Sequence, residues 1–139
     1  MNRRDLATSR PVPATRWFED SFGAIPGQVS AARHAVGRLL ADCPVRDEAL
    51  LIVSELASNS VLHSQSRGGG EFTVRAEIHG DDYIWLEVED AGGPWRVQAP
   101  DGERGHGLQL VAALSGAWGV EDIGQAGAGG RVVWARLEL

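Results

Sequence analysis

Apolar and polar residues are distributed along the chain with two different periods, and each period predicts its own kind of element. Three stretches carry apolar residues three or four positions apart, which is the spacing of one helix face. The first runs from Gln28 to Ala41, the second from about Val45 to Ser64, and the third is opened by Gly105-His106-Gly107. The apolar stripes of these predicted helices are Val29, Ala32, Val36, Leu39 and Leu40; Ala49, Ile52, Val53 and Leu56; and Leu108, Leu110, Val111 and Leu114.

The strands are predicted mainly in the second half of the chain. Phe72–Ile78 alternates apolar and polar residues, the period of a half-buried strand. Tyr83–Glu89 follows after a tight connection, so the two stretches are predicted to form a hairpin. Three further strands are predicted at residues 16–22, 118–123 and 131–137. Most of the five tryptophans fall at these strand positions, where packing against the sheet is expected.

The order of these elements predicts the fold class. Helices gather early, strands gather late, and neighbouring strands are joined by short turns. We therefore expect an α+β fold, a two-layer sandwich with a mostly antiparallel or mixed sheet and helices on one face. The other face of the sheet would then stay open to solvent or to a partner. Residues 1–14 are polar and contain two prolines, which predicts a flexible tail, and residues 15–139 form one domain.

Composition narrows the choice of partners and of compartment. The 139 residues carry a formal net charge of −6, which argues against a nucleic-acid surface because phosphate contacts need clustered Lys and Arg. Cys43 is the one cysteine, so neither an internal disulfide nor a cysteine metal cluster can form. No long apolar run follows residues 1–5, so we expect no signal peptide, and no apolar run is long enough for a bilayer. We expect a cytoplasmic protein.

Three polar residues stand four positions apart within the otherwise apolar second helix: Glu55, Asn59 and His63. This spacing places them on one face, where a carboxylate and a carboxamide one turn apart offer a proton acceptor beside a Mg²⁺ ligand. A solvated helix face that happens to carry an asparagine would have the same pattern. The spacing alone does not separate these two interpretations.

Two glycine-containing turns supply further candidates. Asp90-Ala91-Gly92-Gly93 ends a strand, where an aspartate can accept a hydrogen bond from an exocyclic amine and glycine lets a flat ring approach the backbone. Arg104-Gly105-His106-Gly107-Leu108 opens a helix, whose free amide groups favour phosphate. Taken singly, the first is also an ordinary Asp-Gly turn and the second an ordinary hinge. Together the three elements supply the metal ligand, the adenine contact and the phosphate cradle that a nucleotide needs.

In these stretches the sequence resembles the GHKL ATPase family, and within it the small anti-sigma-factor serine kinases and their actinobacterial relatives. The resemblance rests on residues 55–63, 90–93 and 105–111, and extends over about residues 16 to 139. It implies ATP bound with Mg²⁺ at the helical side of the sheet. By position, Glu55 would be the general base, Asn59 would bind the nucleotide through Mg²⁺, and Asp90 would bind the adenine amino group.

The remaining positions follow from the same resemblance. Gly92 would lie near the base, Gly105 and Gly107 at the phosphates with Arg104 and His106 beside them, and Leu108 in the helix behind. Residues 94–104 would form a short lid over the nucleotide. The sequence departs from the family before the last strand, where Gly129-Gly130-Arg131-Val132 stands in place of a common Gly-Thr or Gly-Lys-Thr. Without this hydroxyl, one polar contact expected near the adenine is in question. The role of Arg131 is also open.

The resemblance also implies a function. It is that of a serine/threonine protein kinase which binds a sigma factor and phosphorylates an anti-sigma-factor antagonist, and the family suggests a homodimer. The alternative is a nucleotide-dependent protein-binding module without phosphotransfer, in which ATP orders a docking surface. The presence of both Glu55 and Asn59 favours the kinase.

Overall fold

The computed structural model describes residues 14–63, 69–92, 102–123 and 130–139, with the side chains of residues 63 and 102–107 excepted. The described residues form five strands and three helices. In chain order these are β1 (Arg16–Gly23), α2 (Pro26–Leu39), α3 (Arg46–His63), β2 (Glu71–His79), β3 (Tyr83–Asp90), α4 (Gly102–Leu114), β4 (Ala117–Ile123) and β5 (Gly130–Glu138). The predicted tail, residues 1–14, lies outside the described ranges except for Ala14.

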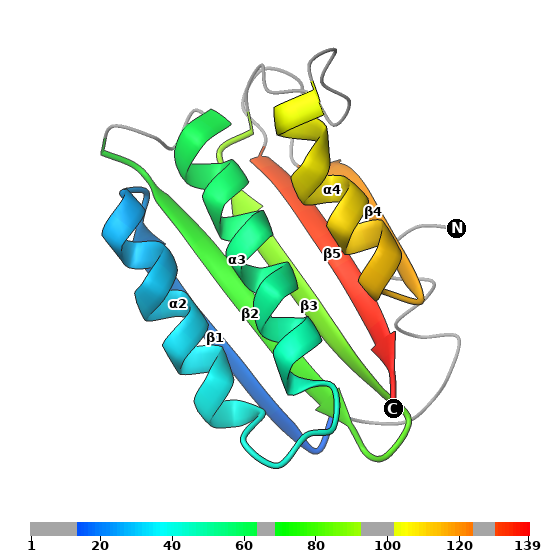
Figure 1. Ribbon diagram of the computed structural model, residues 1–139. Helices are drawn as coiled ribbons and strands as arrows, with labels where there is room; N and C mark the ends of the chain where they lie inside the picture. The colour runs from blue at the N-terminus through cyan, green and yellow to red at the C-terminus, as the bar shows by residue number, and fades with distance from the viewer. Residues whose placement is uncertain (1–13, 64–68, 93–101, 124–129) are drawn as a thin grey trace.

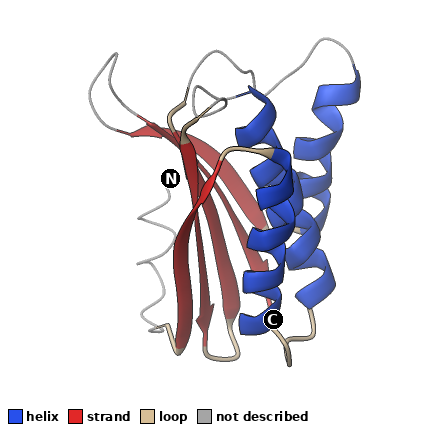
Figure 2. Cartoon of the chain, turned by 90° about the vertical axis from the view of Figure 1, so that its left-hand side faces the viewer, coloured by secondary structure: helices blue, strands red, loops and turns tan. Residues whose placement is uncertain are grey.

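The strands form one sheet in the order β1-β2-β3-β5-β4, and every neighbouring pair is antiparallel. The helices α2, α3 and α4 lie side by side on one face of this sheet, with α3 in the middle (Figure 1). Figure 2 shows the two layers edge-on, with the strands in one and the helices in the other. The predicted two-layer α+β sandwich is therefore confirmed, as is the hairpin formed by β2 and β3.

The helix boundaries follow from local chemistry. α2 starts at Pro26, two residues before the predicted start, because proline lacks the N–H that the first helical turn leaves unbonded and has a suitable φ. α3 carries Asp47 and Glu48 in its first turn, where the positive end of the helix dipole favours carboxylates. Each boundary lies within two residues of its predicted position, apart from the start of α4.

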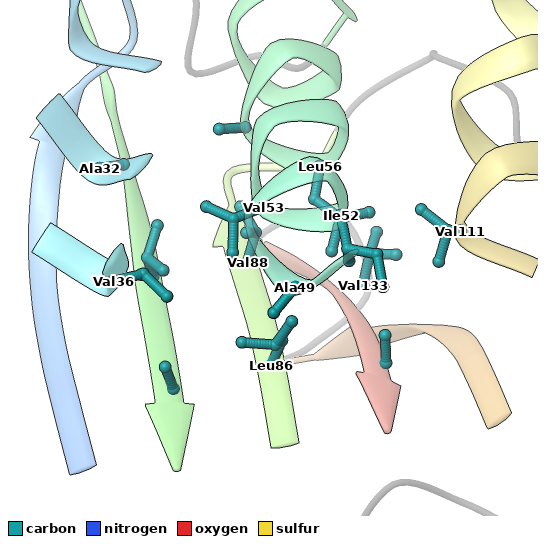
Figure 3. Close-up of a cluster of buried hydrophobic side chains, with 14 of the residues drawn as sticks. Ala32, Val36, Ala49, Ile52, Val53, Leu56, Leu86, Val88, Val111 and Val133 are labelled. Atoms are coloured by element: carbon teal, nitrogen blue, oxygen red, sulfur yellow. The ribbon is translucent and has the colours of Figure 1, made fainter. Parts of the chain in front are cut away.

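The core lies between the two layers. Figure 3 shows side chains of α2, α3 and α4 gathered over the strands, among them Val36, Ile52 and Val111. The whole predicted stripe of α3 is buried there, namely Ala49, Ile52, Val53 and Leu56. Burial of such side chains contributes about 25 cal/mol for each Å² of apolar surface removed from water. This packing holds α3 firmly against the sheet.

The face of the sheet opposite the helices is less open than the sequence predicts. Trp85 and Trp134 stack there with ring centroids 4.9 Å apart, and both side chains are buried. The guanidinium of Arg136 lies 3.8 Å above the ring of Tyr83, which is also buried. Long side chains on adjacent strands thus stack on one another on this face. Trp17, by contrast, is 69% exposed on the edge strand β1, so the expectation of packing is wrong for this tryptophan.

Candidate functional site

Asp90, the predicted site residue of β3, contacts the last part of α3 at one end of the fold. The last turn of α3 and the first turn of α4 lie at the same end of the helical layer (Figure 1). The hydroxyl of Ser60, in the last part of α3, donates a hydrogen bond of 2.6 Å to Oδ2 of Asp90, the final residue of β3. Both residues are buried. The bond therefore fixes the end of β3 against the helix that carries Glu55 and Asn59.

Asp90 is a buried carboxylate with both oxygens in use. Its Oδ1 accepts a hydrogen bond of 2.7 Å from the backbone N–H of Gly92, and its Oδ2 accepts the bond from Ser60. Burial raises the pKa of Asp90 above the ordinary aspartate value, and these two hydrogen bonds offset part of that rise. A carboxylate has about four lone-pair sites, so each oxygen retains the capacity to accept one more bond.

Two glycines shape the backbone around this carboxylate. Gly92 has a φ of +75°, a backbone conformation that is unfavourable for residues with a Cβ atom. Gly130, at the start of β5, lies so close to β3 that a Cβ there would stand 2.5 Å from the backbone oxygen of Asp90. Both positions therefore require the smallest residue. The role of Gly92 close to the base stays a prediction.

Arg131 supplies a positive charge next to Asp90. The two residues are opposite each other in the register of β3 and β5, and the charge of Arg131 lowers the pKa of Asp90 against the effect of burial. Its Nε lies 3.5 Å from Oδ1 of Asp122 on β4. Where the resemblance leads one to expect a threonine hydroxyl, this chain thus has a guanidinium that contacts Asp122 and acts on Asp90 through its charge.

Glu55 and Asn59 lie on the flank of α3 that faces α4. Leu50 marks the opposite flank, because it lines a pocket together with Arg33 of α2. Asn59 is nine positions further along, about two and a half turns, which places it on the other side of the helix from Leu50. Both Glu55 and Asn59 are partly exposed. Their side chains are accessible to a ligand on this flank, while the side chain of His63 lies outside the described residues.

The predicted phosphate cradle needs a correction. α4 begins at Gly102, so Gly105, His106 and Gly107 lie inside its first turns and do not open it. The amide groups without an intrahelical partner belong to the first turn, residues 102–104, which includes Arg104. The apolar stripe of α4 starts only at Leu108, which is buried, so the first turn has no apolar residue to mark it in the sequence. Residues 102–104, expected in the lid, are helical, and residues 94–101 lie outside the described ranges.

The donor chemistry of these residues is compatible with Mg²⁺ and a nucleotide. Within the described ranges, no three His, Cys, Asp or Glu side chains gather into a metal-binding group. Mg²⁺ commonly takes one or two protein ligands and completes its shell with phosphate and water, so the amide oxygen of Asn59 is a suitable protein ligand.

No helix in the described part of the chain has the length and apolar character required to span a membrane.

Ser60 is the site residue that sequence reasoning missed. It lies directly after Asn59 and points to the core side of α3, where a buried hydroxyl among apolar neighbours needs a partner. A serine on the core side of a predicted helix therefore indicated a buried hydrogen bond. The sequence did not indicate its partner, Asp90, because that residue belongs to a different element. The close approach of Gly130 to Asp90 was likewise unforeseen.

These features define a class: an α+β sandwich with an antiparallel sheet, a buried aspartate at a strand end, and a helix that carries a carboxylate and a carboxamide one turn apart. The sequence comparison agrees. Residues 22–137 match the family described as histidine kinase-like ATPase domain, and the chain belongs to this family. No curated protein matches the sequence. The protein is thus a GHKL-type ATPase domain, which implies that it binds ATP in a regulatory role.

Proposed function

We propose that the protein is a serine/threonine protein kinase that acts as an anti-sigma factor and phosphorylates an anti-sigma-factor antagonist. The observation that carries the proposal is the placement of Glu55 and Asn59. They lie one turn apart on the accessible α4-facing flank of α3, and Ser60 of the same helix holds Asp90. An ATP-binding domain that only orders a docking surface has no need of a carboxylate beside the metal ligand.

Each residue has a separate part in this proposal. Asp90 accepts a hydrogen bond from the adenine amino group through the free capacity of its anchored carboxylate. Gly92, without a side chain, leaves room for the base. Asn59 holds Mg²⁺ through its amide oxygen. The first turn of α4, with Arg104, presents free amides and a positive dipole end to the phosphates.

Glu55 is the general base of the proposed transfer. Mg-ATP, when bound, supplies the phosphoryl group and neutralises part of its charge. Glu55 would accept the proton of the serine or threonine hydroxyl of the antagonist while the hydroxyl oxygen bonds to the γ-phosphorus of ATP and ADP leaves. A single base in such a position contributes about 10²- to 10⁴-fold to the rate. The rest of the catalytic effect comes from positioning and from the donors around the phosphates.

Phosphate transfer from labelled ATP tests the proposal directly. The purified full chain is incubated with γ-labelled ATP, Mg²⁺ and candidate antagonist proteins, and covalent label on a serine or threonine of the antagonist is expected. Equilibrium titration of ATP with and without Mg²⁺ is measured in parallel. Saturable Mg-dependent binding with no transfer to any antagonist that the protein binds would overturn the kinase and support the protein-binding module instead.

A further inference from the structure

A pocket of about 320 Å³ lies between α2 and α3, on the flank of α3 that faces away from Asn59. Arg33 lines it from α2, and five residues line it from α3: Arg46, Asp47, Leu50, Leu51 and Ser54. None of these residues has a part in the proposed nucleotide site. The pocket is therefore separate from the proposed nucleotide site.

The arginine from α3 is held in a fixed place. Nε of Arg46 donates a hydrogen bond of 3.2 Å to the backbone oxygen of Gly37 in α2. A Cβ at position 37 would stand 2.9 Å from Nη2 of Arg46, so a larger residue there would displace the guanidinium from its present place against this helix. Glycine in a helix interior is unfavourable relative to alanine. Its presence here is explained by the position it gives to Arg46.

The two arginines of the pocket retain hydrogen-bond donors for a further acceptor. Arg33 is exposed and has no ion-pair partner in the described part of the chain. Besides its hydrogen bond to Gly37, the one ion-pair contact of Arg46 within the described residues is a long one of 3.8 Å, from Nη1 to Oδ1 of Asp47, whose side chain is 92% exposed. A guanidinium has five donors, so both arginines keep donors for a further acceptor. Two arginines and the carboxylate of Asp47 line the pocket, so its lining carries a formal charge of +1 in a chain whose net charge is −6.

The remaining wall offers one polar group and one apolar surface. The hydroxyl of Ser54 is shielded from solvent and has no hydrogen-bond partner in the described part of the chain. Buried hydroxyls usually have one, so this group is an exception among the described residues. Leu51 is 43% exposed beside it. A free inorganic anion would satisfy the arginines but would leave Leu51 in water.

We propose that this pocket docks a segment of a partner protein that presents an aspartate or glutamate next to an apolar side chain. The carboxylate lies between Arg33 and Arg46, and the apolar side chain covers Leu51. The inference rests on the proposed role as a regulator that binds proteins. It does not depend on phosphate transfer, because the pocket and the nucleotide site are on opposite flanks of α3.

Peptide selection tests this docking surface even while the partner protein is unidentified. A phage-displayed library of random peptides is selected on the full chain and counter-selected on the double variant Arg33→Glu, Leu51→Glu. The selected peptides are then synthesised with a fluorescent label, and their affinities are measured by anisotropy. We expect them to combine Asp or Glu with Leu, Ile, Val or Phe, and to lose at least about tenfold in affinity when either pocket residue is replaced singly.

Two variants outside the pocket serve as matched controls. Arg38→Glu makes the same charge change on α2, and Leu62→Glu makes the same apolar-to-acidic change on α3, at a residue that is 55% exposed. Both should keep the wild-type affinity for the peptides. Circular dichroism checks that all variants fold, and an ATP titration separates the two proposals, since the pocket variants should bind ATP as the wild type does.

Three results would overturn the proposal. One is a selection that yields no peptide sensitive to the pocket variants, and another is a set of sensitive peptides without acidic residues. The third is an unchanged affinity in Leu51→Glu together with displacement of the peptides by inorganic phosphate at constant ionic strength, which would make the pocket an anion site only. Failure of ATP to bind the wild-type chain would instead contradict the proposed function and leave the docking result standing.

Discussion

The hydroxyl of Ser60 and the carboxylate of Asp90 are separated by 30 positions in the sequence and by 2.6 Å in the fold. One belongs to the helix that carries Glu55 and Asn59, and the other ends the strand next to Gly92. Because both groups are buried, the bond is shielded from competing water. It joins the part of the site expected at the metal to the part expected at the adenine.

Replacement of Ser60 by alanine removes this bond and leaves one oxygen of a buried carboxylate without its partner. The free energy of unfolding should fall by about 1–3 kcal/mol, the usual effect of leaving a buried polar group unsatisfied. Urea denaturation at neutral pH measures the change. ATP affinity should fall as well, because within the described residues Asp90 would then keep only the hydrogen bond from the N–H of Gly92.

Ser58→Ala is the matched control, since Ser58 lies in the same helix but is partly exposed. It should change the free energy of unfolding by no more than about 0.5 kcal/mol. Equal losses in the two variants would mean that the Ser60–Asp90 bond has no special effect on stability.

Asp90→Asn should change how stability depends on pH. Burial raises the pKa of Asp90 in the folded protein, so the folded state holds this proton more tightly than the unfolded state. The stability that the protonated group contributes is complete below the ordinary aspartate pKa of about 3.9 and is lost as the pH rises through the raised folded pKa. We therefore subtract the free energy of unfolding of Asp90→Asn from that of the wild type. This difference should decrease as the pH rises above about 4. Urea titrations at a series of pH values check this, and an opposite slope would contradict it.

The same variant should weaken adenine recognition at neutral pH. The asparagine has one acceptor oxygen in place of two, so one acceptor for the exocyclic amine is lost. Hydrogen bonds to charged groups are worth about 1.5–3 kcal/mol, which corresponds to roughly a ten- to hundredfold loss of ATP affinity. Calorimetric titration with ATP measures it. An unchanged ATP affinity would show that Asp90 does not contact the base.

The parts of the fold that depend on local spacing were predictable from the sequence. The stripe of Ala49, Ile52, Val53 and Leu56 is contained in one helix, and its burial follows from the helical period alone. The alternation of residues 72–78 predicted strand β2 correctly, because the period of a strand is also a local property. Glu55 and Asn59 share a flank because their spacing is fixed by the helix.

Relationships between elements were not predictable in this way. The bond from Ser60 to Asp90 and the stacking of Trp85 on Trp134 depend on which strands are neighbours and in which register. A shift of one residue in register would move each side chain to the other face of the sheet. The start of α4 was misplaced for a local reason, because glycines are weak helix formers and the preceding turn has no apolar stripe.

Gly130→Ala should disturb the junction of β3 and β5. The added Cβ would meet the backbone oxygen of Asp90 at 2.5 Å, and a backbone atom in a sheet cannot rotate away as a side chain can. We expect a loss of about 1–3 kcal/mol in the free energy of unfolding, as for other overpacked sites. Gly27→Ala is the control, because a Cβ there meets nothing within 4 Å and the residue is helical. Thermal unfolding should place Gly27→Ala at or above the wild-type midpoint and Gly130→Ala below it; the reverse order would refute the steric argument.

Glu55→Gln separates catalysis from binding. The substitution keeps the size of the side chain and its place on the exposed flank of α3, but an amide cannot take the hydroxyl proton. Phosphate transfer to the antagonist should therefore fall by about 10²- to 10⁴-fold while the affinity for Mg-ATP stays close to that of the wild type. Asn59→Ala should behave differently, because loss of the amide oxygen weakens binding chiefly when Mg²⁺ is present. The pair of variants is measured in the labelled-ATP assay and in ATP titrations with and without Mg²⁺. A Glu55→Gln protein that transfers phosphate at the wild-type rate would exclude Glu55 as the base, whatever the behaviour of Asn59→Ala.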